Sequence, residues 1–392
     1  MARIFISTGE VSGDLQGAFL VEALKRQAEK INLDLEIIAL GGSRMAKAGA
    51  TILADTTGIG SVGILESIPY IIPTIKIQEK AKNHLKNNPP DVVVLIDYLG
   101  PNMGIGNYIR HHLPSLPIVW YIAPQEWVWS ISRRNTSIIV GVTDLLLAIF
   151  PEEARYFEKK GAKVQWVGHP LVERMQQAPT RETARQRLGI KEEEKAIALF
   201  PASRQQELKY LMPVMFQGAK ILQDKYPEIR FFIPLSRENY REAIEKAIEN
   251  YNLRAIVLEK QTLEIIAASD LAITKSGTVN LEIALLNVPQ VVIYRVNRFT
   301  AWVAQYILKF SIPFMSPPNL LLMQEIVPEL LQDEVTPENI VSEATELLIN
   351  QKRREQLLAD YQQMRQQLGD VGVCDRAAHA IFSFLLPKET EK

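Results

Sequence analysis

A turn of small residues between two apolar runs carries side chains that suit a nucleotide diphosphate. Ser276, Gly277 and Thr278 lie between predicted strands at 271–274 and 289–294. Backbone N–H groups and the helix dipole at the opening of the following helix favour an anion such as phosphate. Glu282 lies about one turn further along the same helix face, where its carboxylate could bind a ribose. An ordinary Ser/Thr-capped helix explains this stretch equally well.

A second candidate for binding phosphate follows the predicted strand at 196–200. Ser203 is placed to cap the next helix, and Glu207 completes a capping-box pattern. Arg204 would then lie at the opening of that helix, where its guanidinium can hold diphosphate oxygens in a bidentate way. Without a metal, such a cation is needed to stabilise a departing diphosphate.

Asp97 directly follows the apolar run at 92–96 and is a candidate general base. Burial at the end of a strand would raise its pKa and make it a better proton acceptor. Asn102 could bind the same ligand. The alternative for Asp97 is a turn-forming residue with a hydrogen bond to its own backbone, and the position favours function.

The first predicted strand, at 3–7, ends in a turn that could also meet a ligand. The turn runs from Thr8 to Asp14 and contains Gly9 and Gly13, which allow close approach of the backbone. Glu10 or Asp14 could bind sugar hydroxyls. Ser12 and Asp14 could instead simply cap the following helix, and the pattern slightly favours that reading for both.

Two further stretches suit a lipid-linked sugar. Glu126 stands between amide and tryptophan side chains at 124–129, which fits a sugar or acyl site, although tryptophans are more often core residues. The segment from Leu65 to Lys86 has an apolar part followed by lysines, a pattern typical of docking at a membrane surface. From pattern alone, an amphipathic core helix is slightly favoured for that segment.

Alternating apolar runs and helical patterns must position these residues. The chain has 392 residues, which favours two domains. Several runs are apolar on both faces, as covered parallel strands require. We therefore predict two doubly wound Rossmann-like domains, 1–170 and 171–369, with a cleft between them. From Thr336 onward only helices are expected, and a helix within about 370–392 is expected to pack back onto the first domain.

Composition excludes several classes of protein. The net charge of −1 gives no indication of a nucleic-acid partner. One cysteine, Cys374, rules out an internal disulfide and fits a reducing compartment. The first residues read as a strand rather than a signal peptide, and no apolar run is long enough to span a membrane. Scattered histidines and the absence of HExxH or CxxC patterns predict no metal site, and no cofactor is indicated.

Taken together, these motifs resemble those of the lipid A disaccharide synthase family, inverting glycosyltransferases with a GT-B fold. The resemblance runs nearly end to end and rests on the order and spacing of six motifs. They are 9–14, 96–97, 201–204, 276–282, 294–295, and 316–321 with Glu325.

The resemblance implies a reaction and a role for each candidate. The family joins UDP-2,3-diacylglucosamine to 2,3-diacylglucosamine 1-phosphate through a β-1,6 link and releases UDP. Asp97 would deprotonate the acceptor hydroxyl, and Arg204 would bind the diphosphate. The family resemblance also implies a peripheral protein on the cytoplasmic face of the inner membrane, docked through Leu65–Lys86, with a homodimer possible. The remaining implied substrate-binding residues are Gly9, Glu10, Ser12, Gly13, Asp14, Asn102, Glu126, Ser203, Ser276, Gly277, Thr278, Glu282, Asn319 and Glu325.

This chain departs from the family pattern at three positions. Ala202 replaces a usual glycine, Gly100 a frequent acidic residue, and Glu126 lies in a changed Trp motif. The alternatives are therefore another GT-B lipid glycosyltransferase, a UDP-sugar epimerase, or a nucleotide-sugar-binding protein without catalysis. An isomerised UDP-sugar made without acceptor would indicate an epimerase, and UDP binding without turnover a binding protein.

Overall fold

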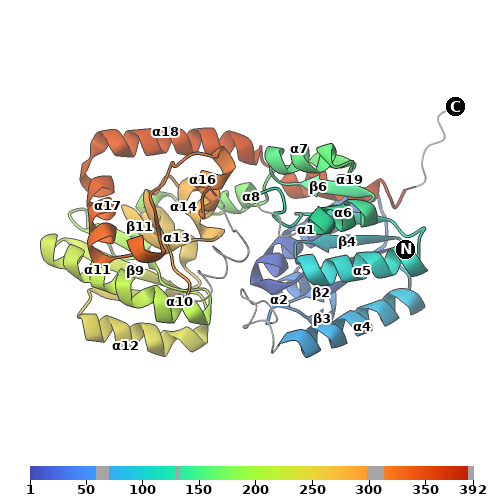
Figure 1. The fold of residues 1–392 in the computed structure, drawn as a ribbon, viewed down its shortest axis with the longest axis horizontal. Helices are drawn as coiled ribbons and strands as arrows, with labels where there is room; N and C mark the ends of the chain where they lie inside the picture. Colours follow the sequence, from blue (N-terminus) through green and yellow to red (C-terminus); the bar gives the residue numbers. More distant parts are fainter. Residues whose placement is uncertain (59–69, 129–132, 298–312, 387–392) are drawn as a thin grey trace. The chain divides into compact units, whose positions relative to one another are not determined.

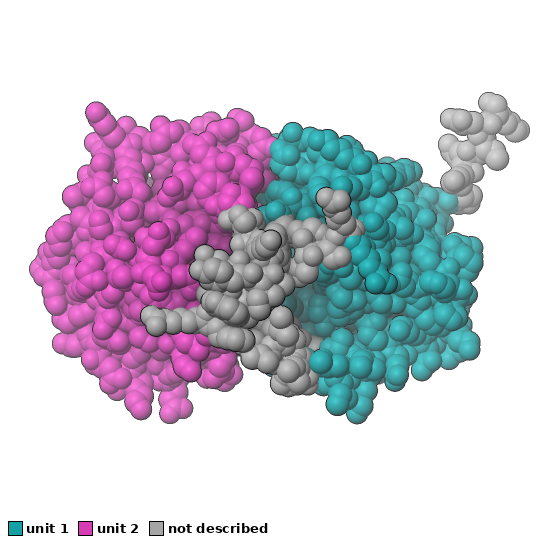
Figure 2. Space-filling model, in the orientation of Figure 1, with its two compact units in different colours: residues 1–170, 368–392 teal, residues 171–367 magenta. Residues whose placement is uncertain are grey.

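The computed structural model describes residues 1–58, 70–128, 133–297 and 313–386. The chain forms two compact units: unit 1 is Met1–Pro170 with Leu368–Lys392, and unit 2 is Leu171–Gln367 (Figure 2). Each unit contains one parallel sheet with helices around it (Figure 1). This confirms the prediction of two doubly wound α/β folds.

Unit 1 is built on a seven-stranded sheet of order β3-β2-β1-β4-β5-β6-β7. Its strands are β1 Ala2–Ser7, β2 Leu35–Gly41, β3 Thr51–Asp55, β4 Val92–Ile96, β5 Ile118–Tyr121, β6 Leu145–Ala148 and β7 Val164–Trp166. Its helices are α1 Glu10–Lys30, α2 Ser43–Lys47, α4 Ile71–Asn87, α5 Leu99–His112, α6 Arg133–Val142, α7 Pro151–Lys159 and α19 Val373–Phe382. All five residues of β4 are buried, as the apolar run at 92–96 requires.

The C-terminal helix of the chain belongs to unit 1. Helix α19 packs against α1, and Arg26 pairs with Asp375 at 2.9 Å. The Arg376 guanidinium donates to the carbonyl of Val167 at 2.8 Å, just after β7. These contacts fix the returning chain on the unit formed by the first 170 residues.

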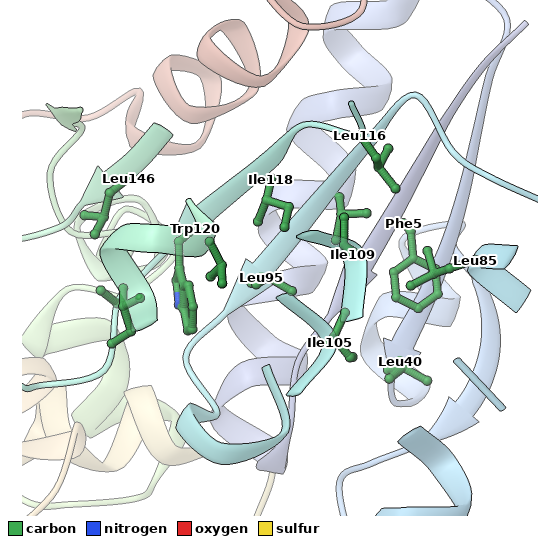
Figure 3. Packing of buried hydrophobic residues seen from close by; sticks show 14 of the residues in the cluster. Phe5, Leu40, Leu85, Leu95, Ile105, Ile109, Leu116, Ile118, Trp120 and Leu146 are labelled. Atoms are coloured by element: carbon green, nitrogen blue, oxygen red, sulfur yellow. The ribbon is translucent and has the colours of Figure 1, made fainter. Parts of the chain in front are cut away.

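A hydrophobic core cluster of unit 1 lies between its sheet and helices α4, α5, α6 and α7. Side chains from neighbouring strands converge on Ile105 and Ile109 of α5 and on Leu85 of α4 (Figure 3). Trp120 of β5 is fully buried among them. Each such side chain contributes about 1.5–3 kcal/mol by leaving water, so this layer holds the ends of the strands rigidly.

Unit 2 is built on a six-stranded sheet of order β10-β9-β8-β11-β12-β13. Its strands are β8 Lys195–Phe200, β9 Ile229–Leu235, β10 Ala255–Glu259, β11 Leu271–Lys275, β12 Gln290–Tyr294 and β13 Glu329–Leu331. Its helices are α8 Leu171–Met175, α9 Arg181–Arg187, α10 Gln205–Tyr210, α11 Met212–Lys225, η2 Glu238–Tyr240, α12 Arg241–Tyr251, α13 Thr262–Ala268, α14 Val279–Leu285, α16 Pro317–Leu322, η4 Gln332–Glu334, α17 Pro337–Ile349 and α18 Gln351–Leu368.

In both sheets, the candidate residues follow strands at the point where the strand order reverses. In unit 1, β1 pairs with β4, and in unit 2, β8 pairs with β11. At these pairs the winding of the sheet reverses, and the loops after the two strands diverge to leave room for a ligand. The edge strands β3 and β13 were not among the strands expected from the sequence, because neither is a continuous buried apolar run.

Candidate active site

Asp97 lies at the end of β4 on a backbone that Asn102 holds in place. Asp97 and Tyr98 both have left-handed backbones, with φ of 45° and 52°. The Asn102 amide donates to the carbonyls of Asp97 at 2.7 Å and Ile96 at 3.0 Å. Its oxygen accepts from the Ser7 hydroxyl at 2.7 Å, which ties β1 to the same point. Such backbones are strained for residues other than glycine, so Asn102 is a positioning residue.

The Asp97 carboxyl group has the acidity that a general base needs. Its side chain is exposed, yet the protein surrounding it removes enough hydration to raise its pKa to about 6, and the negative charge of Glu10 adds to this effect. A hydrogen bond from the Tyr98 backbone N–H acts in the opposite direction. At pH 7 the group is therefore mostly ionised, while being a stronger base than an ordinary aspartate.

The first turn of unit 1 packs directly against the Asp97 loop. A Cβ on Gly9 would lie 2.5 Å from the Tyr98 ring, and a Cβ on Gly13 would lie 2.0 Å from Thr8 Oγ1. Only glycine allows these two approaches. Glu10 begins α1 with φ of 61°, and Ser12 is exposed.

Asp14 belongs to the same turn, but its hydrogen bonds are internal. Its carboxylate accepts from the backbone N–H groups of Gly42 at 2.8 Å, Arg44 at 3.1 Å and Met45 at 3.1 Å. These donors lie at the start of α2, so Asp14 caps α2. The sequence had instead suggested that Asp14 caps its own helix, α1. Its position supports the turn beneath Glu10.

Glu153 is a buried carboxylate near Asp97 that the sequence did not single out. It accepts from the N–H groups of Ala123, Ile149 and Phe150, which follow β5 and β6. Burial raises its pKa to about 7 despite these three hydrogen bonds, and the charge of Asp97 adds to the increase. Its only signal in the sequence is an acidic residue in the first turn of a helix after a strand.

Glu126 is buried at 5% exposure and accepts from the Asn135 side chain at 3.2 Å. Trp127 packs against Phe150, with the ring centroids 5.7 Å apart. Trp129 of the same motif lies outside the described residues. Glu126 and Trp127 thus pack into unit 1, in line with the alternative that tryptophans are more often core residues.

In unit 2, the turn at 276–278 follows β11 as predicted, and α14 opens directly after it. The Gly277 N–H, however, donates to Asn280 Oδ1 at 2.7 Å. The Ser276 hydroxyl donates to the Met315 carbonyl at 2.6 Å. Thr278 is exposed. Two of the groups expected to bind phosphate are therefore engaged within the unit, which leaves more of the task to side-chain cations.

Arg204 lies at the N-cap position of α10, after the end of β8. Glu207 Oε2 accepts from Ser203 N at 2.5 Å, from Ser203 Oγ at 3.1 Å and from Arg204 N at 3.0 Å. Ser203 was expected to cap the helix; its hydroxyl instead donates to Glu207. The Arg204 guanidinium approaches Glu207 only to 3.7 Å, and its side chain is 45% exposed, so it can reach a ligand.

Glu282 lies one turn into α14 and is almost completely buried, at 5% exposure. Its carboxylate accepts a hydrogen bond from Arg174 of α8. Arg174 was not identified from the sequence, because the two residues are 108 positions apart. The pairing fixes the direction of the Glu282 carboxylate, as binding of a diol would require.

Lys275 and Tyr294 complete the group of polar side chains at this edge of the sheet. Lys275 ends β11 and pairs in register with Ile293, the neighbour of Tyr294 on β12. Burial raises the pKa of the Tyr294 hydroxyl, and the charge of Arg204 acts in the opposite direction. Lys275 was missed in the sequence, although a lysine that ends an otherwise apolar strand is a usable signal.

Asn319 and Glu325 differ in how they relate to a ligand. Asn319 is fully buried, and its amide donates to the Val327 carbonyl at 2.9 Å and to Glu329 at 2.7 Å. Its oxygen accepts from the N–H groups of Ile326 and Val327. Asn319 therefore braces the loop after α16, whereas Glu325 is exposed.

Comparison with known proteins identifies the family. The family model described as Lipid-A-disaccharide synthetase matches residues 4–384. The lipid-A-disaccharide synthase of Gloeothece citriformis is 58% identical over 98% of this chain and 100% of its own length. The corresponding protein of Synechocystis is 55% identical over 97% and 98%. The chain belongs to the lipid-A-disaccharide synthetase family. The prediction of this family from the sequence is confirmed.

Solved structures agree with the fold of this chain. The Staphylococcus aureus MnaA–UDP co-structure has a TM-score of 0.68, at 17% identity, over 98% of this chain and 97% of that one. At this identity the likeness shows the fold alone, which is GT-B. Among the helices in the described ranges, none is long and apolar enough to cross a membrane.

At two positions where this chain departs from the expected family pattern, the structure shows what surrounds the changed residue. A Cβ on Gly100 would meet nothing within 4 Å, so the acidic residue expected there would fit without rearrangement. Ala202 is buried, and its carbonyl accepts from the Ser236 hydroxyl at 2.8 Å. Neither change disturbs the loops that carry Asp97 and Arg204.

Proposed function

We propose that this protein transfers 2,3-diacylglucosamine from its UDP derivative to the 6-hydroxyl of 2,3-diacylglucosamine 1-phosphate. The products are a β-1,6-linked disaccharide 1-phosphate and UDP. Membership of the lipid-A-disaccharide synthetase family supports the substrate class. The observation that carries the chemistry is Asp97, an accessible carboxylate with a pKa of about 6 on a braced strand end.

Inversion at the anomeric carbon requires one base and one stabilised leaving group. Asp97 accepts the proton of the acceptor hydroxyl while the oxygen of that hydroxyl attacks C1 of the donor sugar. Glu10 lies close enough to Asp97 for its charge to raise the pKa of that residue, so it is the best candidate to bind acceptor hydroxyls. Asn102 keeps the attacking geometry by fixing the backbone of Asp97.

Unit 2 supplies the site for UDP in this proposal. Arg204 binds diphosphate oxygens, and the turn at 276–278 contributes the Thr278 side chain and the remaining backbone donors. Glu282, oriented by Arg174, binds the ribose hydroxyls. Asn319 acts indirectly by bracing the wall that carries Glu325.

The acylated substrates also require a surface at which lipid can be reached. Ile71, Ile72 and Ile75 of α4 are each at least half exposed, and Lys76 beside them is exposed too. Further along the helix Ala81 and Leu85 are buried in the core, so α4 is a core helix whose first turns carry exposed apolar side chains. Leu65 and Ile68 lie outside the described residues.

We therefore place α4 at an anionic membrane surface, with the protein peripheral on the cytoplasmic face of the inner membrane. Sedimentation with anionic vesicles should recover the wild type and lose an Ile71→Glu, Ile72→Glu variant. Equal recovery of both would contradict this docking surface. Dimerisation stays a prediction, which light scattering can test.

The experiment for the activity is incubation of purified protein with both acylated sugars. Mass spectrometry should find the disaccharide 1-phosphate and an equal amount of UDP, and NMR should show the β anomer. Isomerised UDP-sugar formed without acceptor would indicate an epimerase instead. Binding of UDP without any product would indicate a binding protein.

A further inference from the structure

Lys275 occupies a position at which a cation would meet a bound diphosphate. It is the last residue of β11, the strand beside which the winding of the second sheet reverses. Thr274, one residue earlier, pairs with Phe200 at the end of β8, and the β8 loop carries Arg204. On the other side Lys275 pairs with Ile293 of β12. Lys275 therefore lies between the loop of Arg204 and the end of β12.

The Lys275 ammonium lies over the phosphate-binding turn. A Cβ on Gly277 would come within 2.5 Å of Lys275 Nζ, so the absence of a side chain at Gly277 makes room for this group. Among the described residues, the ammonium donates to the Ser276 carbonyl at 3.4 Å. An ammonium has three donors, and one long hydrogen bond uses little of that capacity.

Within the described part of the chain, Lys275 forms no ion pair within 4 Å, although carboxylates lie near it. The negative charges of Glu207 and Glu282 both act to raise the pKa of Lys275. Glu207, however, accepts three hydrogen bonds from Ser203 and Arg204, and Glu282 accepts from Arg174. The two acids therefore stabilise their own loops, and the ammonium remains available.

We propose that Lys275 is a second diphosphate-binding cation, which acts with Arg204 to stabilise the negative charge that develops on the departing UDP. This inference rests on the proposed function. In the transfer step the bond between C1 and the β-phosphate oxygen breaks, and its electron pair goes to that oxygen. The acceptor oxygen bonds to C1, and its proton passes to Asp97. The new charge on the phosphate is then paired with Lys275 and Arg204.

The electrostatics of the free protein agree with this role. Burial lowers the pKa of Lys275, since the positive charge has lost part of its hydration without gaining a close partner. A diphosphate would supply that partner. A structural lysine with its head group in water would show no such deficit.

Calorimetry with UDP, UMP and uridine tests the proposal on Lys275→Met and Lys275→Arg variants. Lys246→Met is the control, because Lys246 is exposed on α12 of the same unit. We expect Lys275→Met to weaken UDP binding by about ten- to a hundredfold and uridine binding by less than about twofold. Lys275→Arg should recover most of the UDP affinity, and the control should match the wild type. In transfer assays kcat should fall with little change in KM for the acceptor.

The outcomes separate this inference from the proposed function. If Lys275→Met binds UDP as tightly as the wild type while the wild type makes disaccharide, Lys275 is not a diphosphate ligand. If Lys275→Met loses UDP affinity but the wild type makes no disaccharide, the proposed transferase activity is overturned and Lys275 remains a diphosphate ligand. A wild type that does not bind UDP overturns both. If Lys275→Met does not fold, judged by its thermal melt, Lys275→Gln is used for the same comparison.

Discussion

The side-chain amide of Asn102 donates to the backbone carbonyl of Asp97 at 2.7 Å. This hydrogen bond closes the left-handed turn that aims the candidate base. Asn102 also accepts from Ser7 at 2.7 Å, so the ends of β1 and β4 are held as one piece. The strand end that carries the candidate base is therefore set by a fully buried residue that need not touch substrate.

Asn102→Ala should lower kcat by about ten- to a hundredfold, because the Asp97 carboxylate loses its fixed direction. It should also lower the free energy of unfolding by about 2–4 kcal/mol, since several buried partners lose their hydrogen bonds. Asn107→Ala, on the same helix, is the matched control. Urea unfolding and steady-state kinetics separate the two effects. A kcat equal to that of the wild type in folded Asn102→Ala would rule out the positioning role.

The dependence of activity on pH should report the Asp97 carboxyl group. With a pKa of about 6, protonation should reduce kcat/KM about tenfold per pH unit below that value. The Glu10 charge helps to raise this pKa, so Glu10→Gln should move the inflection to lower pH. A profile that stays flat down to pH 5, with folding intact, would be inconsistent with Asp97 as the base.

Glu153 should make stability depend on pH in the opposite sense to an ordinary paired carboxylate. Its pKa rises from 4.5 to about 7 on folding, so the folded state binds a proton more tightly than the unfolded chain. The stability it contributes is complete below about pH 4.5 and is lost as the pH rises towards 7, by at most about 1.4 kcal/mol per pH unit.

Thermal melts at pH 5, 6 and 7 test this effect of Glu153. The stability of the wild type relative to Glu153→Gln should decrease as the pH rises. Glu158→Gln is the control, because Glu158 is an exposed residue on the same helix. A constant difference between wild type and Glu153→Gln across this range would show that the carboxyl group is not shifted.

Glu282→Gln should weaken UDP and uridine binding by similar factors, about tenfold each, because both ligands carry the ribose. Arg174→Met should have a smaller effect, acting only through the orientation of Glu282. Calorimetry on the two single variants and the double variant gives the coupling. If none of the three changes uridine affinity, the pair is purely structural and the ribose lies elsewhere.

The sequence predicted the elements better than the contacts within the site. Continuous apolar runs such as 92–96 mark buried parallel strands, and their ends gave Asp97 and Arg204. Edge strands whose residues are only partly buried, such as Thr51–Asp55, lack this signal. Arg174 could not be predicted as the partner of Glu282, because contacts across 108 positions depend on the packed fold. The resemblance implied Asp14 and Asn319 as substrate-binding residues, which stays a prediction. In the structure Asp14 accepts from backbone groups of its own unit, and Asn319 bonds to backbone groups and to Glu329.

The most direct test compares Asp97→Asn with the wild type in two measurements on the same preparation. One is transfer of the acylated sugar, and the other is UDP affinity by calorimetry. If Asp97 is the general base, transfer should fall by at least about a hundredfold, while UDP affinity should change by less than about twofold. Transfer at the wild-type rate in Asp97→Asn would contradict this role, because no base would then be needed at the end of β4.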